Sequence, residues 1–159
     1  MIFVTVGSQV PFDRFIAAVD EWAEQRCLSD VFAQIGRANY VPKHIRFAAF
    51  LDPSEFRAMM DEARLVVAHA GIGSIFSALE LGKPLVVMPR RAKFREQRND
   101  HQVATAKYFE ERARVVVAYG AESLAEKLDY ALTLEPCERV STAASPQLIS
   151  AIRHFLDNG

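Results

Sequence analysis

Residues 65–74 read Leu65-Val66-Val67-Ala68-His69-Ala70-Gly71-Ile72-Gly73-Ser74, and this stretch is the strongest indication of fold class in the chain. Its first four residues are apolar without alternation, which is typical of a strand buried on both faces of a sheet. After the glycine-rich turn, apolar residues recur at helical spacing from residue 75 to residue 81, and Gly82 and Pro84 end that helix. Residues 85–88 form a second apolar run. A strand, a helix and a second strand in this order make the repeating unit of a parallel sheet.

The same alternation of short apolar runs and amphipathic segments continues along the whole chain. Further strands are predicted at residues 2–6, 31–35, 44–51 and 115–118. Helices are predicted at residues 12–23, from residue 52 onward, and at 100–112, 122–134 and 146–156. We therefore expect an α/β fold, a Rossmann-like parallel sheet with helices on both faces. The 159 residues suffice for one domain, and the last helix either covers this domain's own sheet or docks on a partner.

The composition argues against several classes of protein. The formal net charge is −1, so the sequence predicts no nucleic-acid partner held by bulk charge. The two cysteines, Cys27 and Cys137, form no metal-ligand pattern, and we expect a cytoplasmic location without a disulfide or a zinc site. The first seven residues lack the basic start of a secretory signal, and no apolar run approaches the roughly 20 residues of a membrane span.

The glycine-rich turn is the first candidate binding site. Backbone N–H groups around Gly71, Gly73 and Ser74, together with the Ser74 hydroxyl, suit a diphosphate because they stand at the positive end of a helix. The alternative is a tight turn in which the glycines adopt positive φ and Ser74 only caps the helix. His69, directly before the turn, bonds either a ligand oxygen or a loop carbonyl.

A polar, basic stretch at residues 89–102 is the second candidate. Because parallel strands place their carboxyl ends at one edge of the sheet, this stretch and the glycine turn should share that edge. Arg90 and Arg91 suit an anionic ligand there, and a solvated basic loop is the alternative. Four hydrogen-bonding side chains then open a helix and suit the hydroxyl groups of a polar ligand, namely Asn99, Asp100, His101 and Gln102. For Asp100 the alternative is a helix N-cap.

Several further positions carry weaker signals. Gly7 and Ser8 follow the first strand and form either an anion nest or a plain turn. Ser77 and Glu80 lie three residues apart on the helix after the glycine turn, where either suits a ribose hydroxyl. An exposed Glu80 without a ligand is the alternative. Asp20, in the first helix, is expected on the solvated face.

Five short motifs follow one another along the chain, and they are Val4-Thr5-Val6-Gly7-Ser8-Gln9-Val10-Pro11-Phe12-Asp13, His69-Ala70-Gly71-Ile72-Gly73-Ser74, Gly82-Lys83-Pro84, Met88-Pro89-Arg90 and Asn99-Asp100-His101-Gln102. In this order and spacing they resemble the C-terminal, donor-binding half of glycosyltransferase family 28. The resemblance covers residues 2–135. It is strongest to small stand-alone members, which are catalytic subunits of two-part UDP-sugar transferases in eukaryotic lipid-linked and bacterial exopolysaccharide synthesis.

The resemblance implies the C-terminal half of a GT-B fold and an inverting transfer of a sugar from a UDP-sugar. The implied acceptor is a sugar on a polyprenyl diphosphate, in exopolysaccharide or glycolipid synthesis. A membrane-anchored, acceptor-binding subunit would complete the enzyme and hold this chain peripherally at the cytoplasmic membrane face. The resemblance implies no cofactor and no essential metal, because the UDP-sugar is itself the substrate.

The resemblance also assigns roles to residues of this chain. It places Gly7, Ser8, Gly71, Gly73 and Ser74 at the diphosphate, where the residues themselves suggest adding His69, Arg90 and Arg91. It places Asp100, His101 and Gln102, beside Asn99, at the donor sugar or diphosphate. The catalytic base is expected in the partner, with His101 as the candidate in this chain. Related transferases usually hold the ribose with an acid at the position of Ser77, and Glu80 is the expected substitute.

Three other functions compete with this interpretation. The first is a non-catalytic module, derived from such a domain, that binds a UDP-sugar or a partner protein. The second is a sugar-nucleotide epimerase of the GT-B type, but those chains are longer and contain both halves. The third is a flavodoxin-like carrier, whose phosphate loop normally follows the first strand and is richer in Ser and Thr.

Overall fold

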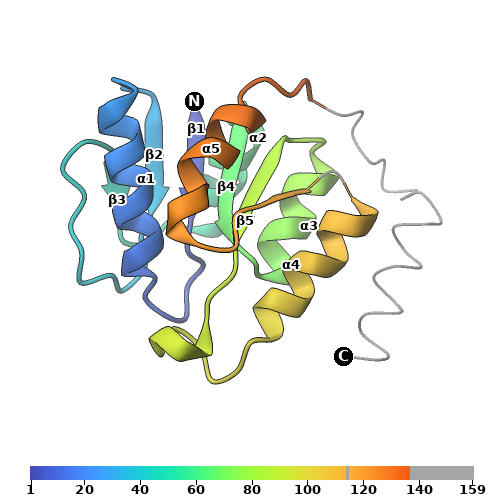
Figure 1. Cartoon of the computed structure of the whole chain (residues 1–159). Coiled ribbons are helices and arrows are strands. Elements are labelled where there is room, and N and C mark those ends of the chain that lie inside the picture. Colours follow the sequence, from blue (N-terminus) through green and yellow to red (C-terminus); the bar gives the residue numbers. More distant parts are fainter. Residues whose placement is uncertain (114, 137–159) are drawn as a thin grey trace.

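Six parallel strands form the centre of the molecule (Figure 1). The structure is a computed structural model and describes residues 1–113 and 115–136. The strands are β1 (Ile2–Thr5), β2 (Val31–Gln34), β3 (Arg46–Ala48), β4 (Leu65–His69), β5 (Leu85–Met88) and β6 (Val115–Val117). They pair in the order β3-β2-β1-β4-β5-β6, and every neighbouring pair is parallel. The predicted Rossmann-like sheet is therefore confirmed.

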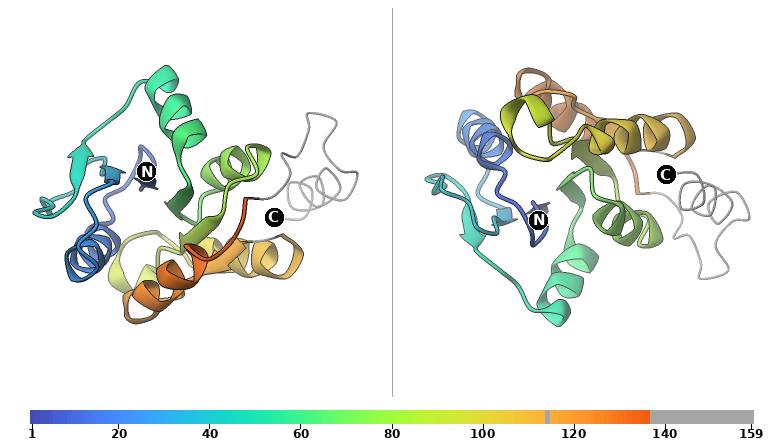
Figure 2. Two further views of the ribbon diagram at one scale, coloured as in Figure 1. Left: turned by 90° about the horizontal axis from the view of Figure 1, so that it is seen from above. Right: turned by 90° about the horizontal axis from the view of Figure 1, so that it is seen from below.

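Five α-helices and one short 3₁₀ helix surround the sheet in the described part of the chain, namely α1 (Asp13–Gln25), α2 (Pro53–Glu62), α3 (Ile72–Glu80), η1 (Ala92–Phe94), α4 (His101–Arg112) and α5 (Ala121–Ala131). The apolar residues of α1 and α5 pack on one face of the sheet, and those of α2, α3 and α4 pack on the other. Figure 2 shows α1 and α5 on the side of the sheet opposite α2 and α3. Helices on both faces are what a sheet of buried parallel strands requires.

The strands divide their side chains between these two layers because successive residues of a strand point to opposite faces. Ile2 and Val4 belong to the apolar cluster beneath α1 and α5, while Phe3 between them belongs to the other cluster. The register carries this pattern across the sheet, since Val4 lies beside Val67 of the neighbouring strand. The apolar runs in the sequence thus reflect burial on both sides.

The boundaries of some elements differ from those predicted. The third strand spans three residues instead of the predicted 44–51, and it lies at the sheet edge, where short strands limit pairing with other chains. The helix after the glycine turn begins at Ile72 instead of residue 75, because the turn residues themselves form its first turn. The helix predicted at 122–134 spans Ala121–Ala131. The helix predicted at 146–156 and Cys137 lie outside the described residues.

Asp20 was predicted on the solvated face of the first helix, and this prediction is wrong. The side chain is fully buried, and its carboxylate accepts hydrogen bonds from the Tyr40 hydroxyl and from the backbone N–H groups of Lys43, His44 and Ile45. Burial opposes ionisation, but these donors outweigh it and hold the pKa of Asp20 below its ordinary value. The carboxylate thereby organises the crossing from β2 to β3.

The carboxyl ends of all six strands lie at one edge of the sheet, as expected for the loops that begin at Gly7, Gly36, Gly71 and Pro89. β1 and β4 are neighbours at the centre. From β1 the chain continues to β2 on one side, and from β4 to β5 on the other. We call these two strand ends and the loops that leave them the switch point. None of the described helices is long and apolar enough to cross a membrane.

Candidate functional site

The β4–α3 turn places free backbone donors at the switch point. Gly71 is the N-cap of α3, and no side chain caps the helix there. The N–H groups of Ile72, Gly73 and Ser74 therefore have no acceptor within the helix, as in any first helical turn. Because the helix dipole adds partial positive charge at the same point, this turn suits an anion. The alternative prediction, a turn with positive φ and a capping Ser74, is wrong, since φ of Gly71 is −91° and Gly73 is helical.

The two glycines of this turn are present for different reasons. A Cβ atom added to Gly71 would lie 2.1 Å from Nε2 of His69, so the fold itself requires a glycine there. A Cβ atom added to Gly73 would meet no heavy atom within 4 Å. The fold therefore does not require Gly73, and the exposed space beside it is where an anion would contact the free N–H groups.

His69, at the end of β4, lies between the turns of β1 and β4. Its Cε1 atom would be 2.7 Å from a Cβ atom added to Gly7, so the ring lies close to both glycines. Burial, and then the positive charge of Arg90, lower the pKa of His69 to about 4, against a smaller opposing effect of the Thr5 backbone. The ring is therefore neutral at pH 7, and it does not attract an anion by charge.

The loop after β1 is tied down by Arg90, which follows β5. The Nη2 atom of Arg90 donates to the carbonyl oxygens of Val6, at 2.9 Å, and of Val10. The guanidinium also lies 4.9 Å from the ring centre of Phe12. The side chain is only 3% exposed, and burial lowers the pKa of Arg90 to about 10 in spite of nearby Glu96. Arg90 thus supports the loop through Nη2, while its buried Nε atom has no hydrogen-bond partner within the described residues.

The β5–α4 loop is held by Glu96, which the sequence analysis did not identify. Its carboxylate accepts from Nε and Nη2 of Arg14, at 2.8 and 2.9 Å, and from the backbone N–H of Arg91, at 2.9 Å. Arg14 comes from α1, so the pair joins the start of α1 to the β5–α4 loop. The Nε atom of Arg91 lies 4.0 Å from Asp100. The alternative of a solvated basic loop therefore does not hold for Arg90 and Arg91, which make contacts within the protein.

The polar residues that open α4 divide into two groups. Gln102 is 4% exposed, and its Oε1 atom accepts from the backbone N–H of Arg90, so it supports the strand end. Asp100 is at the N-cap position, but its carboxylate accepts from the backbone N–H of Ala92 and not from the helix. Asn99 and His101 are exposed and contact each other. Asn99 and His101 are therefore exposed and do not support the strand end, whereas the Asp100 carboxylate is engaged within the loop.

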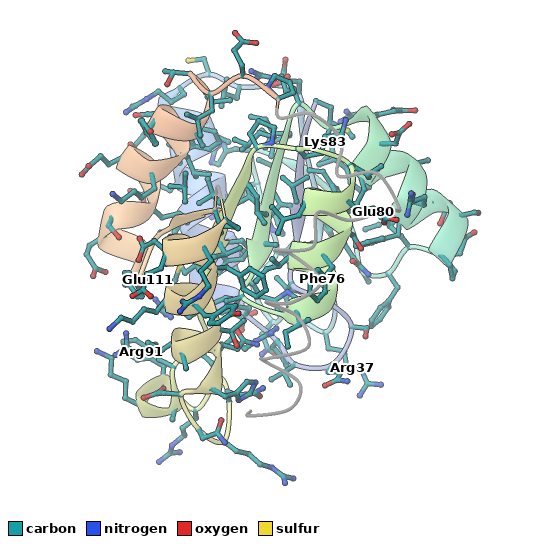
Figure 3. All side chains as sticks on the ribbon, turned by 90° about the vertical axis from the view of Figure 1, so that its right-hand side faces the viewer. Arg37, Phe76, Glu80, Lys83, Arg91 and Glu111 are labelled. Atoms are coloured by element: carbon teal, nitrogen blue, oxygen red, sulfur yellow. The ribbon has the colours of Figure 1, made fainter. Side chains whose placement is uncertain are left out.

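Of the two residues suggested for the ribose, only Ser77 lies near the glycine turn. Its hydroxyl donates to the carbonyl oxygen of Gly73 at 3.0 Å. Glu80 lies at the other end of α3 and pairs with Arg57 at 3.3 Å. Figure 3 shows Glu80 beside Lys83, away from the edge that carries Arg37 and Arg91. The structure therefore removes Glu80 from the candidate site. Gly7 makes a local turn with φ of +73°, and Ser8 after it is exposed.

Three buried side-chain nitrogen atoms have no hydrogen-bond partner within the described residues. They are Nδ1 of His69, Nε of Arg90 and Nε of Arg91. All three belong to the switch point and the loop beside it. Leaving a buried donor without a partner costs about 1–3 kcal/mol, so such atoms need an explanation. A ligand with acceptor oxygens would relieve this cost.

The same residues of this chain match a known protein family. The model described as "Glycosyltransferase family 28 C-terminal domain" matches residues 1–151. The chain belongs to this family. Its family 28 domain includes the whole switch point, so the resemblance stated from the five motifs is confirmed. Within the described residues of the domain, no three His, Cys, Asp or Glu side chains are grouped as a metal site would require.

Individual proteins resemble the family 28 domain over different shares of their length. The mouse "UDP-N-acetylglucosamine transferase subunit ALG13" is 36% identical over 115 residues, 66% of this chain but 9% of the mouse protein. A solution structure of ALG13 has a TM-score of 0.62 at 22% identity and covers 99% of this chain and 95% of its own. MurG from Acinetobacter baumannii has a TM-score of 0.59 at 17% identity, over 96% of this chain and 45% of its own.

These similarities show the fold of the family 28 domain, which is that of GT-B glycosyltransferases. The chain corresponds to less than half of MurG, in agreement with one half of a GT-B fold. It spans about a tenth of the mouse protein, so the activity of that protein is not transferred to this chain by the match alone.

Proposed function

We propose that this family 28 domain is the catalytic, donor-binding subunit of a two-part inverting glycosyltransferase, and that the switch point binds the diphosphate of a UDP-sugar. The observation that carries the proposal is the first turn of α3. Three N–H groups have no acceptor in the helix there, and Gly73 leaves beside them a space that the fold does not fill. The free nitrogen atoms of His69 and Arg91 add donors from two further elements.

These groups match the charge that develops during transfer. When the bond between the sugar and the diphosphate breaks, negative charge grows on the departing UDP. Preorganised N–H groups and a guanidinium stabilise such charge without a metal ion, and we propose that α3 and Arg91 do so. Ser77 is one helical turn beyond Gly73 and suits a ribose hydroxyl, while His101 and Asn99 suit the sugar.

The names of the relatives support a choice of donor and of assembly. Because the mouse relative is named a UDP-N-acetylglucosamine transferase subunit, UDP-N-acetylglucosamine is the first donor to test. Because that relative is named a subunit, we propose that this chain also has a partner. We propose that the partner is membrane-anchored, binds a polyprenyl-diphosphate-linked sugar and supplies the catalytic base. The chain would then work at the cytoplasmic membrane face, without a cofactor or an essential metal. Water is excluded only when both halves close, so the isolated chain should bind donor but turn over poorly.

Calorimetric titration of the purified chain with UDP, ADP and a panel of UDP-sugars tests the proposal. We expect UDP to bind, Gly73→Val to abolish binding, and Arg91→Gln to weaken it about tenfold, the worth of one charge-assisted hydrogen bond. Arg90 is not a suitable test, because its loss would release the β1 loop. Ala58→Val, on an exposed position of α2, adds bulk far from the switch point and should leave binding unchanged.

Two results would contradict nucleotide binding at the switch point, and a third would contradict catalysis. One is UDP binding that survives Gly73→Val, which would place the nucleotide elsewhere. The other is the absence of nucleotide binding both in the isolated chain and in the complex with its partner. If the complex binds UDP-sugar but transfers nothing to a lipid-linked acceptor, with or without EDTA, the non-catalytic module is the correct function.

A further inference from the structure

The β5–α4 loop ends in an exposed basic segment, residues 93–98, which we call the basic tip. Lys93, Arg95 and Arg98 are exposed, and Phe94 among them is 51% exposed. Figure 1 shows the short helix η1, in yellow-green, projecting beyond the edge of the sheet at which the strands end. What distinguishes Phe94 from the other exposed aromatic residues of the chain is that it lies among these cations on a projecting loop.

The positive charge of this loop is not balanced within it. Residues 90–98 contain five Lys or Arg residues and one acid, Glu96, in a chain whose net charge is −1. The carboxylate of Glu96 is occupied by Arg14 and by the Arg91 backbone. The cations of the basic tip therefore present their charge to solvent.

The loop is also built to keep Phe94 at the surface. The guanidinium of Arg14, held by Glu96, lies 4.6 Å from the ring centre of Phe94, and the ammonium of Lys93 lies 4.8 Å from it. Arg95 adopts a left-handed conformation, with φ of 58°, and its N–H donates to Ala92. Two cations therefore lie against the ring of Phe94, where apolar side chains would lie in a hydrophobic core. The hydrogen bond from Arg95 to Ala92 closes the turn.

We propose that the basic tip docks the chain directly on an anionic lipid surface. A half-exposed aromatic ring suits the boundary between headgroups and acyl chains, and long Lys and Arg side chains extend from there to anionic headgroups. A protein partner is a poorer match, since a standard protein interface involves about 20–30 residues on each side, while the basic tip has six. The contact is peripheral and does not depend on nucleotide binding. It would turn the switch point toward the membrane.

Sedimentation of the full chain with vesicles tests this inference. We expect binding to phosphatidylcholine vesicles that contain phosphatidylglycerol, none to pure phosphatidylcholine, and weaker binding as salt increases. The variant K93Q/R95Q/R98Q should bind about 100-fold more weakly, or about fivefold for each cation removed. Phe94→Ser should bind about tenfold more weakly at unchanged charge.

A charge-matched variant controls for nonspecific attraction. K43Q/R46Q/K107Q removes three exposed cations outside the tip and should change vesicle binding by less than about threefold. The inference is overturned if the wild-type chain does not bind anionic vesicles, if the two triple variants lose binding equally, or if only a protein partner requires the tip. The tip variants should still bind UDP, so failure of this inference and failure of the proposed function give different results.

Discussion

Replacing glycine by alanine should destabilise the fold far more at Gly71 than at Gly73, although both residues lie in the same turn. A Cβ atom at position 71 would lie 2.1 Å from Nε2 of His69, while ordinary contacts begin at 3.4 Å. The ring must therefore move by about 1 Å or more, and it is largely buried. No backbone strain contributes, because φ of Gly71 is −91°, which any residue adopts.

Overpacking of this kind costs about 1–3 kcal/mol and occasionally more, and we expect Gly71→Ala to lose about 3 kcal/mol of unfolding free energy. Gly73→Ala should lose nothing and can gain up to about 1 kcal/mol, because alanine is the better helix residue and no atom opposes it. Urea unfolding followed by the fluorescence of Trp22, which is buried, measures both.

A double-mutant cycle separates the clash from other causes. If the His69 ring is the obstacle, His69→Ala should remove most of the cost of Gly71→Ala, with a coupling of about 2 kcal/mol. The reasoning is refuted if Gly71→Ala and Gly73→Ala have equal effects on stability. It is also refuted if the costs of His69→Ala and Gly71→Ala simply add.

Two further predictions concern buried titratable groups. Asp20→Asn should lose about 2–4 kcal/mol of unfolding free energy, because its NH2 group replaces one carboxylate oxygen and faces two of the four donors. Glu21→Gln on the exposed side of α1 should lose almost nothing, and equal losses would refute this. The pKa of His69 is about 4 when folded and 6.5 in its ordinary state, so its neutral form stabilises the fold fully above pH 6.5. That stability, up to about 3 kcal/mol, should be lost as pH falls from 6.5 to 4, and urea unfolding at several pH values should show a smaller loss in His69→Asn. An equal loss in the variant would assign the effect to other groups.

The order of strands and helices was predictable because burial on both faces leaves continuous apolar runs. The runs at residues 31–35 and 85–88 match β2 and β5 almost residue for residue. Helix starts were less predictable where no apolar periodicity marks them. The first turn of α3 is built from the glycine motif itself, so the pattern from residue 75 onward misses it. The third strand is short because the edge has no second neighbour to extend it.

The polar contacts of the site were not predictable, because they join residues far apart in the chain. Arg14 and Glu96 are separated by 82 positions, and each alone has the character of a surface charge. Asp20 was misjudged for a related reason, since its partners are mainly backbone N–H groups, which no side-chain pattern records. Arg90 and Gln102 were expected at the ligand, but Nη2 of Arg90 bonds the β1 loop and Oε1 of Gln102 bonds the strand end.

The glycine motif shows how a requirement of the fold can be distinguished from a requirement of a ligand. Spacing alone favours phosphate binding and a plain turn about equally, because both need small residues between a strand and a helix. The structure distinguishes them by what surrounds each missing side chain. Gly7 and Gly71 make room for His69, so their presence says nothing about a ligand. At Gly73 no neighbouring atom of the chain excludes a side chain, and the free N–H groups of α3 adjoin this open space. A glycine without a structural reason, beside donors without partners, is therefore the strongest sign of a ligand site in this chain.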